Sequence, residues 1–305
     1  MFKPSAIFML ATKARILGYG AALFMVTATL AAPEHATSPE KTAVIYAWSE
    51  AMADDPRGHY PIELLKLALD RSGENYIAQP SKHEFGQYRT LRHVQLERDL
   101  DVVWTFTTTA REQELLAIRI PIDRGLLGWR LLLINSKDQH KFDTLSLDEL
   151  KQLRSGQGHD WPDLNVLQQN GFNVFPSSSY SGLFSMLKRR RISYFPRSAT
   201  EIWPEVTQHN EDGISVDSHW ALYYPAPLYF FVSHGKPQLA AAIEKGLRAA
   251  MADGSMKLLF LKHFSDSIDK SALHSRTVVT LTNPDLPKAT PLTETELWFN
   301  PQLGY

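Results

Sequence analysis

The sequence predicts an α/β protein made of two units, the second inserted into the first. Segments typical of strands alternate with segments typical of helices along most of the chain, which favours mostly parallel sheets with helices on both faces. Two breaks rich in proline or glycine, Pro121–Gly128 and Tyr224–Pro227, interrupt this alternation. The strands after the second break do not amount to a third unit, so we expect the chain to return there to the first.

The length of the chain allows this arrangement. Its 305 residues, of which 44% are hydrophobic and 21% charged, are ordinary for a globular protein and suffice for one large domain or two lobes. We therefore expect the first lobe to comprise 42–122 and 226–305, and the second lobe to comprise 123–225.

The first 32 residues differ in character from the rest. Three cations, Lys3, Lys13 and Arg15, precede an uncharged apolar run, Ile16–Leu30, and small residues follow it. This order predicts a secretory signal peptide over 1–31, cleaved near Ala31. An uncleaved membrane anchor is the alternative, although the run is short for a full span. Because the chain has no cysteine, an exported protein of this size fits a bacterial periplasm, where a large core replaces disulfides.

The first unit begins with a strand over Thr42–Trp48, which is rich in apolar residues. A polar loop follows, and Pro61 suits the first position of a helix that Gly73 ends. The next expected elements are a strand at Tyr76–Ala78, a helix at Gln87–Arg98 and a strand at Leu100–Trp104.

The second unit begins with the strongly apolar strand Trp129–Ile134. Ser146 and Glu149 form a capping box ahead of a short helix, and Gly156–Asp160 is expected to be a glycine-rich turn. The further elements are helices at Trp161–Asn170, Gly182–Arg191 and Ala199–Thr207, and strands at Asn173–Phe175, Ile192–Phe195 and His219–Tyr224.

The last part of the chain starts with a strand at Tyr229–Ser233. Pro237–Ala252 has the spacing of an amphipathic helix, and Ser255–His263 is expected to be helical as well. One more strand, Thr277–Leu281, precedes a proline-punctuated tail that we expect to pack on the first lobe.

Asp101–Leu116 has the strongest functional signal of the chain. Its strand ends in four threonines, of which Thr109 is expected to cap the helix Ala110–Leu116 with Glu112 completing a capping box. Arg111 lies in the first turn of that helix. Hydroxyl groups, a helix N-terminus and a guanidinium together favour anion binding. An ordinary strand-to-helix turn with a capping threonine and a solvated arginine is the other interpretation, and both stay open on these residues.

The order of several motifs resembles a known family. After a first strand and a polar loop come DVVWTFTTTARE, IPIDRGLLGWRLLLI, the inserted second lobe, YYPAPLYFFVS and a long helix ending in DGS; the resemblance covers about Thr42–Phe264. This order resembles the type II periplasmic solute-binding proteins of the amino-acid-binding kind, family 3. Uncharacterised proteobacterial members share DxRxxY (Asp55, Arg57, Tyr60), RIPIxxGLLGxR (Arg119–Arg130) and YFPR…E (Tyr194–Arg197, Glu201).

The resemblance implies two lobes that close on a hinge over a small ligand, with mixed, mostly parallel sheets. It implies that Thr107, Thr108 and Arg111 hold the carboxylate of the ligand. The corresponding turn of the second lobe falls on Gly158, His159 and Asp160, where the family more often has serine or threonine.

One departure puts a simple α-amino acid in question. Where the family has an aspartate for the ligand ammonium, this chain has Arg197, with Glu201 a turn further on. A buried guanidinium beside an ammonium would be costly. Either Glu201, Asp160 or Asp55 supplies the countercharge, or the ligand carries more than one anionic group, or the protein does not bind amino acids.

Aromatic residues at strand ends, such as Trp48 and Trp104, are expected either to stack on a ligand or to pack in the core. The residues expected to form the ligand site are Trp48, Arg57, Tyr60, Trp104, Thr107, Thr108, Arg111, Gly158, His159, Asp160, Tyr180, Arg197 and Glu201.

These observations predict a non-enzymatic binding protein for a small anionic or amino-acid-like ligand, without cofactor or metal, serving an ABC permease or a membrane-bound receptor. The near balance of 32 basic and 33 acidic residues gives no indication of nucleic acid as a partner. The alternatives are a lyase or hydrolase on the same scaffold with His159 or Glu201 as general acid, and an interaction protein that has lost its ligand. A metal site at His159, Asp160 and Asp163 lacks the usual dense ligand spacing.

Overall fold

The computed structural model describes residues 40–48, 56–85, 87–209 and 213–305. The expected signal peptide and Asp55 lie outside the described residues, and so does the side chain of Arg57. Within these ranges, no helix combines the length and the apolar character needed to cross a bilayer.

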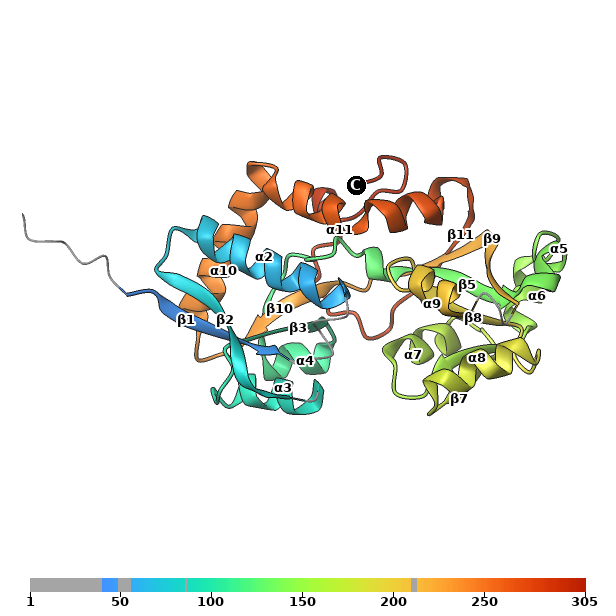
Figure 1. Cartoon of the computed structure of the whole chain (residues 1–305), viewed down its shortest axis with the longest axis horizontal. Coiled ribbons are helices and arrows are strands. Elements are labelled where there is room, and N and C mark those ends of the chain that lie inside the picture. Colours follow the sequence, from blue (N-terminus) through green and yellow to red (C-terminus); the bar gives the residue numbers. More distant parts are fainter. Residues whose placement is uncertain (1–39, 49–55, 86, 210–212) are drawn as a thin grey trace, which may run out of the picture. The chain divides into compact units, whose positions relative to one another are not determined.

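The first sheet has five strands in the order β2-β1-β3-β10-β4 (Figure 1). Its strands are β1 (Thr42–Trp48), β2 (Tyr76–Glu84), β3 (Val102–Phe106), β4 (Leu116–Ile118) and β10 (Leu228–Val232). The pairs of β1 with β2 and with β3 are parallel, whereas β10 runs antiparallel to both β3 and β4. The carboxyl ends of β1, β2 and β3 therefore meet at one edge of this sheet.

The second sheet has six strands in the order β11-β9-β5-β8-β6-β7. Its strands are β5 (Trp129–Asn135), β6 (Ser155–Gly158), β7 (Val174–Ser177), β8 (Tyr194–Ser198), β9 (Ile214–Tyr223) and β11 (Thr277–Thr280). Here β5 is antiparallel to β8 and β9, while the other pairs are parallel. Both sheets are thus mixed, as predicted for the α/β class.

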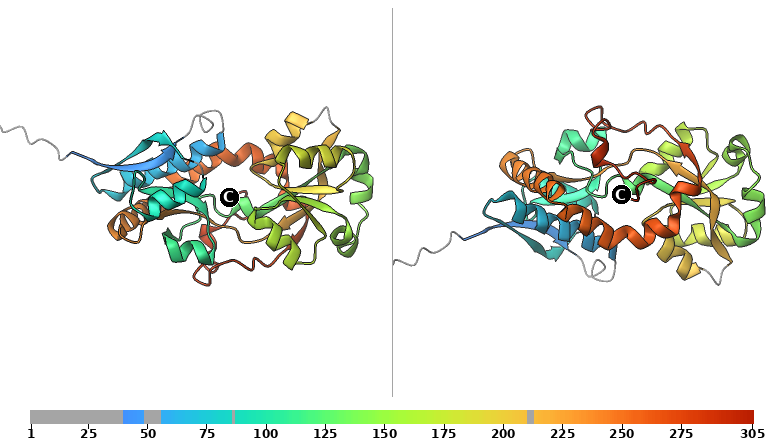
Figure 2. Two further views of the ribbon diagram at one scale, coloured as in Figure 1. Left: turned by 90° about the horizontal axis from the view of Figure 1, so that it is seen from below. Right: turned by 90° about the horizontal axis from the view of Figure 1, so that it is seen from above.

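Helices separate the strands in both sheets. They are α2 (Pro56–Ser72), α3 (Gln87–Gln95), α4 (Thr109–Glu114), α5 (Gln139–Phe142), α6 (Leu147–Gln152), α7 (Pro162–Gln169), α8 (Tyr180–Lys188), α9 (Ile202–His209), α10 (Pro237–Ala252) and α11 (Ser255–Ser271). Helix α10 packs closely against α2 (Figure 2) because Gly246 faces the backbone of Ala68.

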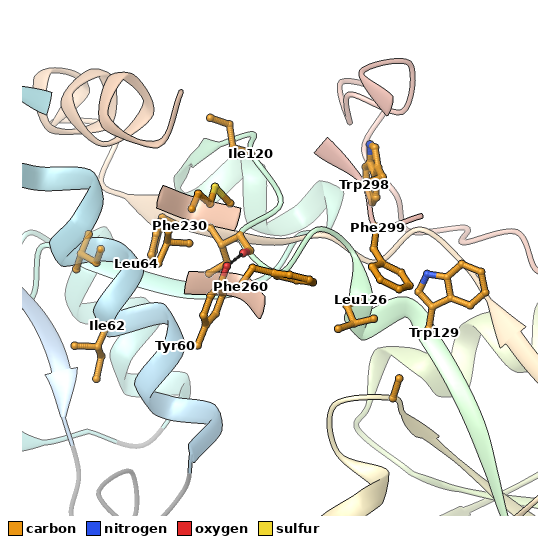
Figure 3. Close-up of a cluster of buried hydrophobic side chains, with 14 of the residues drawn as sticks. Tyr60, Ile62, Leu64, Ile120, Leu126, Trp129, Phe230, Phe260, Trp298 and Phe299 are labelled. Atoms are coloured by element: carbon orange, nitrogen blue, oxygen red, sulfur yellow. Dashed lines mark hydrogen bonds between the residues drawn. The ribbon is translucent and has the colours of Figure 1, made fainter. Parts of the chain in front are cut away.

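A large hydrophobic cluster joins residues of both sheets and of the C-terminal segment (Figure 3). The ring of Tyr60 lies among aromatic residues of α11, and its hydroxyl donates to the carbonyl of Ile122 at 2.5 Å. Trp129 meets Phe299 edge-on, with ring centroids 6.3 Å apart. The aromatic supply of the sequence is therefore largely used in the core.

Several elements are longer than predicted. Helix α2 begins at Pro56 and contains Pro61, which was expected to be its first residue. Strand β2 continues past Ala78 through Pro80, because an edge strand tolerates a residue without an N–H donor. Helix α11 extends beyond His263 to Ser271.

The expected glycine-rich turn at Gly156–Asp160 is wrong in its first part. Ser155–Gly158 is a fully buried strand, β6. A Cβ at Gly156 would collide with Ile192 and Leu183, and one at Gly158 would collide with the indole of Trp161. The glycines thus allow close packing of neighbouring side chains instead of a turn.

The chain changes sheet between Ile118 and Trp129 and returns between Tyr223 and Leu228. It then changes once more, since β11 pairs with β9 in the second sheet. Residues 226–305 therefore do not all belong with the first sheet, in contrast to the expected lobe assignment. The reason is that β9 pairs with β5 along one edge only. Its other edge pairs in parallel with β11 from the C-terminal segment.

Candidate functional site

The threonine-rich end of β3 is organised largely by its own hydrogen bonds. Thr108, and not Thr109, is the N-cap of α4, and its hydroxyl accepts from the backbone N–H of Arg111 at 3.1 Å. The Thr107 hydroxyl donates to Glu112 at 2.7 Å. The capping box expected between Thr109 and Glu112 is therefore replaced by two separate bonds, shifted by one and two residues. Both hydroxyls serve the turn itself.

Arg111 remains available for a ligand. Its guanidinium is half-buried and donates one Nη1 hydrogen bond to the carbonyl of Phe106. Among the described residues, no carboxylate lies within ion-pairing distance of it. Burial lowers the pKa of Arg111, and the charge of Glu114 opposes this shift, but an arginine stays protonated at any physiological pH. A cation with unused donors thus faces the space beside β3.

That space is a pocket of about 470 Å³. Residues from the end of the first sheet line one side, and residues from the second sheet and its helices line the other. They are Thr105, Phe106, Arg111, Arg130, Asp160, Trp161, Pro162, Asp163, Tyr180, Arg197 and Glu201. The pocket therefore combines three guanidinium groups with three carboxylates and three aromatic rings.

Arg130 is one of two buried arginines in the second side of the pocket. It lies 2.6 Å from Asp163 and 3.5 Å from Glu201, and its Nε donates to the Tyr224 hydroxyl at 3.0 Å. Tyr224 in turn donates to Asp163. Burial lowers the pKa of Arg130, but attraction to Asp163, Tyr224 and Glu201 outweighs it and raises the pKa above its usual range.

Arg197 is held in the same way by two glutamates. It contacts both carboxylate oxygens of Glu205 at 2.6–3.0 Å and lies 3.1 Å from Glu201. Burial lowers the pKa of Arg197, yet Glu201 and Glu205 raise it overall. Its guanidinium also lies 4.8 Å from the ring centroid of Trp161. The Nε and Nη2 donors of Arg197 are thus directed at protein carboxylates.

Two arginines organise the charges of the second side. Among the described residues, Arg130 and Arg197 are ion-paired with Asp163, Glu201 and Glu205, and Glu201 contacts both arginines. Asp160 adds a further, mostly exposed carboxylate. On one side, the pocket therefore has a guanidinium that pairs with no carboxylate of the described residues; on the other, it has carboxylates bound to arginines and the exposed Asp160.

The structure brings five of the predicted site residues together in this pocket: Arg111, Asp160, Tyr180, Arg197 and Glu201. Thr107 and Thr108 line a smaller adjoining cavity of about 20 Å³, and Trp104 lines a separate one. The remaining predicted residues lie elsewhere. Trp48 packs against the core, Tyr60 is buried within it, Gly158 lies beneath Trp161, and the side chain of His159 is 57% exposed and outside the pocket lining.

The sequence interpretation missed Thr105, Phe106, Arg130, Trp161 and Asp163. Arg130 had a signal, since it is the only charged residue of the strand β5. Asp163 was considered as a metal ligand, but its carboxylate binds Arg130 and Tyr224. In the part of the chain that is described, no group of three potential metal ligands occurs.

Comparison with known proteins identifies the fold. No protein-family model and no curated protein matches the sequence. Among solved structures, the second substrate-binding domain of a protein assigned as an amino-acid ABC transporter from Streptococcus pneumoniae is similar, with 14% identity and a TM-score of 0.50; the match covers 73% of this chain and 99% of that one.

Two further structures are similar at lower TM-scores. An ancestral arginine-binding protein bound to arginine has 18% identity and a TM-score of 0.49, covering 67% of this chain and 87% of that one. A histidine kinase sensor domain with similarity to periplasmic binding proteins has 12% identity and a TM-score of 0.48, covering 67% and 84%. The likeness to the streptococcal domain shows the two-lobed periplasmic binding protein fold of type II, which confirms the predicted fold class.

Proposed function

We propose that this chain is a periplasmic binding protein that captures a small carboxylate-bearing ligand in the pocket beside β3. The observation that carries the proposal is Arg111, a half-buried guanidinium without a carboxylate partner among the described residues. Charge-assisted, bidentate hydrogen bonds make arginine well suited to a carboxylate. The fold supports this use, since ligands of such sheets lie beyond the carboxyl ends of the strands.

The second side of the pocket suits the opposite charge. The carboxylate of Asp160, which is 72% exposed, favours a ligand that also carries a cationic group, such as an amino-acid-like molecule. Arg197 does not oppose this, because Glu205 and Glu201 neutralise it. Of the three carboxylates that the sequence left open as countercharge, Asp160 is the one proposed here.

We propose that the two lobes, one built on the first sheet and the other on the second sheet with β11, close after capture. Ligand binding would shift the population toward a closed state in proportion to its differential affinity for that state. A permease of the ABC type or a membrane-bound receptor would then recognise the closed form. Binding rather than catalysis is favoured because the candidate general acids lie elsewhere or in ion pairs: His159 is outside the pocket, and Glu201 is shared between two arginines.

The proposal is tested by calorimetric titration of the mature protein with amino acids, dicarboxylates and small peptides, and then of the variant Arg111→Ala with each hit. Loss of charge-assisted hydrogen bonds costs about 1.5–3 kcal/mol, so affinity should fall about ten- to a hundredfold. Arg111→Lys keeps the charge but not the planar fork of donors. Its affinity for each hit should therefore lie between that of the parent protein and that of Arg111→Ala.

Arg248→Ala is the matched control, because that arginine is half-exposed on α10 and pairs with Glu244 at 3.0 Å, outside the pocket. It should bind every hit as the parent protein does. Unchanged binding by Arg111→Ala would show that the site assignment is wrong.

A further inference from the structure

Glu205 is a buried carboxylate behind the wall of the charged pocket. It lies on α9, is 4% exposed, and is not among the described residues that line the pocket. Two residues of that lining, Tyr180 and Arg197, nevertheless donate hydrogen bonds to its carboxylate. Glu205 therefore acts on the pocket through side chains that a ligand can touch, although a ligand does not reach Glu205 itself.

The position of Glu205 follows from the anchoring of α9. This helix packs against β5 and β9 of the second sheet, and its first residue, Ile202, is fully buried. The indole of Trp203 donates to the carbonyl of Ser267 on α11 at 3.2 Å. Glu205 follows Ile202 by three positions and so lies on the same face of the helix. A carboxylate at this depth needs a partner, because burial of an unpaired charge is costly.

Arg197 on β8 is that partner. Its Nε lies 2.8 Å and 3.0 Å from the two carboxylate oxygens of Glu205, and its Nη2 lies 2.6 Å from one of them. Only 5% of the Arg197 side chain and 6% of the Glu205 side chain are exposed. This pairing of a guanidinium with a carboxylate is the strong one, and burial removes the competition from water. The donors that Glu205 occupies are therefore not available to a ligand.

Arg111 and Arg197 thus differ in their availability, although both line the same pocket. Arg111 pairs with no carboxylate of the described residues, whereas Glu205 holds Arg197. Two available guanidinium groups would suit a ligand with two carboxylates, and one suits a ligand with a single carboxylate. Because specificity is a difference between affinities, a residue that the ligand never touches can set it.

We propose that Glu205 is a positioning residue that sets the specificity of the pocket: by holding Arg197, it selects ligands with one carboxylate, bound at Arg111, over dicarboxylates. This inference rests on the proposed function and deepens it by naming the ligand class that the pocket rejects. The Tyr180 hydroxyl, which donates to Glu205 at 2.7 Å, ties the same carboxylate to α8.

The experiment compares ligands that differ only in a second carboxylate: aspartate with asparagine, glutamate with glutamine, and succinate with succinamate. Calorimetry gives the ratio of acid affinity to amide affinity for each pair. The parent protein should bind the amide at least as tightly as the acid. Glu205→Gln keeps the size of the side chain but removes its charge, so Arg197 becomes able to bind the second carboxylate and the ratio should rise about ten- to a hundredfold. A purely structural role would change both affinities alike and leave the ratio constant.

Two further variants test whether Arg197 is the group released. Arg197→Met combined with Glu205→Gln removes the whole ion pair, a replacement that buried sites often tolerate, and should abolish the rise in the ratio. Glu205→Asp withdraws the carboxylate by one methylene and should raise the ratio less than Glu205→Gln does. Circular dichroism checks folding, and Glu205→Asp carries the test where Glu205→Gln does not fold.

Glu244→Gln is the matched control. Glu244 also binds an arginine, Arg248, at 3.0 Å, but it is 46% exposed and lies on α10 outside the pocket. The same change of charge at this position should leave every ratio as it is in the parent protein.

The outcomes separate this inference from the proposed function. A parent protein that prefers the acids, or a ratio unchanged in the folded Glu205 variants, overturns the role of Glu205; if Arg111→Ala still weakens every hit, carboxylate binding stands. A rise that persists in the double variant also overturns it, because Arg197 is then not the group released. If neither parent nor variant binds any pair, the inference fails, and if the wider screen gives no hit either, both proposals fail.

Discussion

At the residue scale, the three arginines of the pocket have different roles because their partners differ. The buried pair, Arg130 and Arg197, is directed at Asp163, Glu201 and Glu205, whereas the Arg111 guanidinium donates to the carbonyl of Phe106 and pairs with no carboxylate of the described residues. An arginine is thus available to bind an anion only when no carboxylate of the protein already pairs with it. Arg111 could be found from the sequence because it lies in the first turn of the helix that follows the threonines. The pairing of Arg130 with Asp163 joins residues 33 positions apart, which no local pattern discloses.

Asp123 gives a prediction about pH. It is 3% exposed, and although it accepts from the N–H groups of Gly125 and Leu127, burial raises its pKa to about 6. An unfolded chain has a pKa near 3.9 for this group. Between about pH 6 and pH 4 the folded state therefore binds a proton that the unfolded state does not. The contribution of Asp123 to the free energy of unfolding should rise as the pH falls through this window.

Urea unfolding of the parent protein and of Asp123→Asn at pH 7, 6, 5 and 4 measures this effect. From pH 7 to pH 4 the stability of the parent should increase relative to the variant by about 2 kcal/mol, somewhat less than the full value for a shift of about two pKa units, because the unfolded carboxyl is itself partly protonated at pH 4. A difference between the two proteins that stays constant with pH would contradict the assignment.

At the element scale, the structure shows which sequence patterns are sufficient to predict a helix or a strand. The capping box of Ser146 and Glu149 is present as expected, because its bonds join residues three apart. The strand β6 was missed because glycines have little strand propensity, and the side chains that require glycine there, Ile192, Leu183 and Trp161, come from other parts of the chain. The start of α4 was predicted to within a residue, whereas β3 ends at Phe106, two residues later than predicted. The limited pairing of β1 with β3 could not be predicted, because it depends on how two distant strands align.

The close contact between α2 and α10 predicts that Gly246→Ala destabilises the protein, although helix propensity alone predicts that it stabilises it. A Cβ at Gly246 would overlap the backbone of Ala68, so Gly246→Ala must push the helices apart. The intrinsic preference for alanine, about 1 kcal/mol in a helix, would alone stabilise the protein. We expect the steric effect to dominate, with a net loss of about 1–3 kcal/mol in denaturant unfolding. A more stable variant would show that the two helices can separate without cost.

At the scale of the whole molecule, the C-terminal tail connects parts that the sequence could not place. Asn283 donates to the carbonyl of Pro225 at 2.8 Å, and Phe299 donates from its backbone to Arg124 at 2.7 Å. Asp285 is central: its carbonyl accepts from Thr109 at the start of α4, and its carboxylate accepts from Asn165 of α7 at 2.8 Å. The tail was expected on the first lobe alone, yet its bonds reach helices of both sheets.

The expected signal peptide is a property of the whole chain that can be measured directly. Expression of the full sequence in a Gram-negative bacterium should yield a periplasmic protein whose N-terminus follows Ala31, because the small residues there suit cleavage. Intact-mass spectrometry of the periplasmic fraction determines the cleavage position. A product that keeps its first residues and sediments with membranes would favour the anchor instead.

The bond between Asp285 and Asn165 is expected to couple the tail to α7. A double-mutant cycle with Asn165→Ala and Asp285→Ala isolates their interaction from other effects of each substitution. A partly buried hydrogen bond to a charged group should give a coupling of about 1–2 kcal/mol in the free energy of unfolding. The exposed pair Gln139 and Asp143, whose bond of 2.8 Å lies within one short segment, should couple more weakly. Because the same bond links α7 at the pocket to the segment that holds the start of α4, its loss should also change ligand affinity. Equal coupling in both pairs, with ligand affinity unchanged, would mean that the tail only covers the two sheets and does not join them.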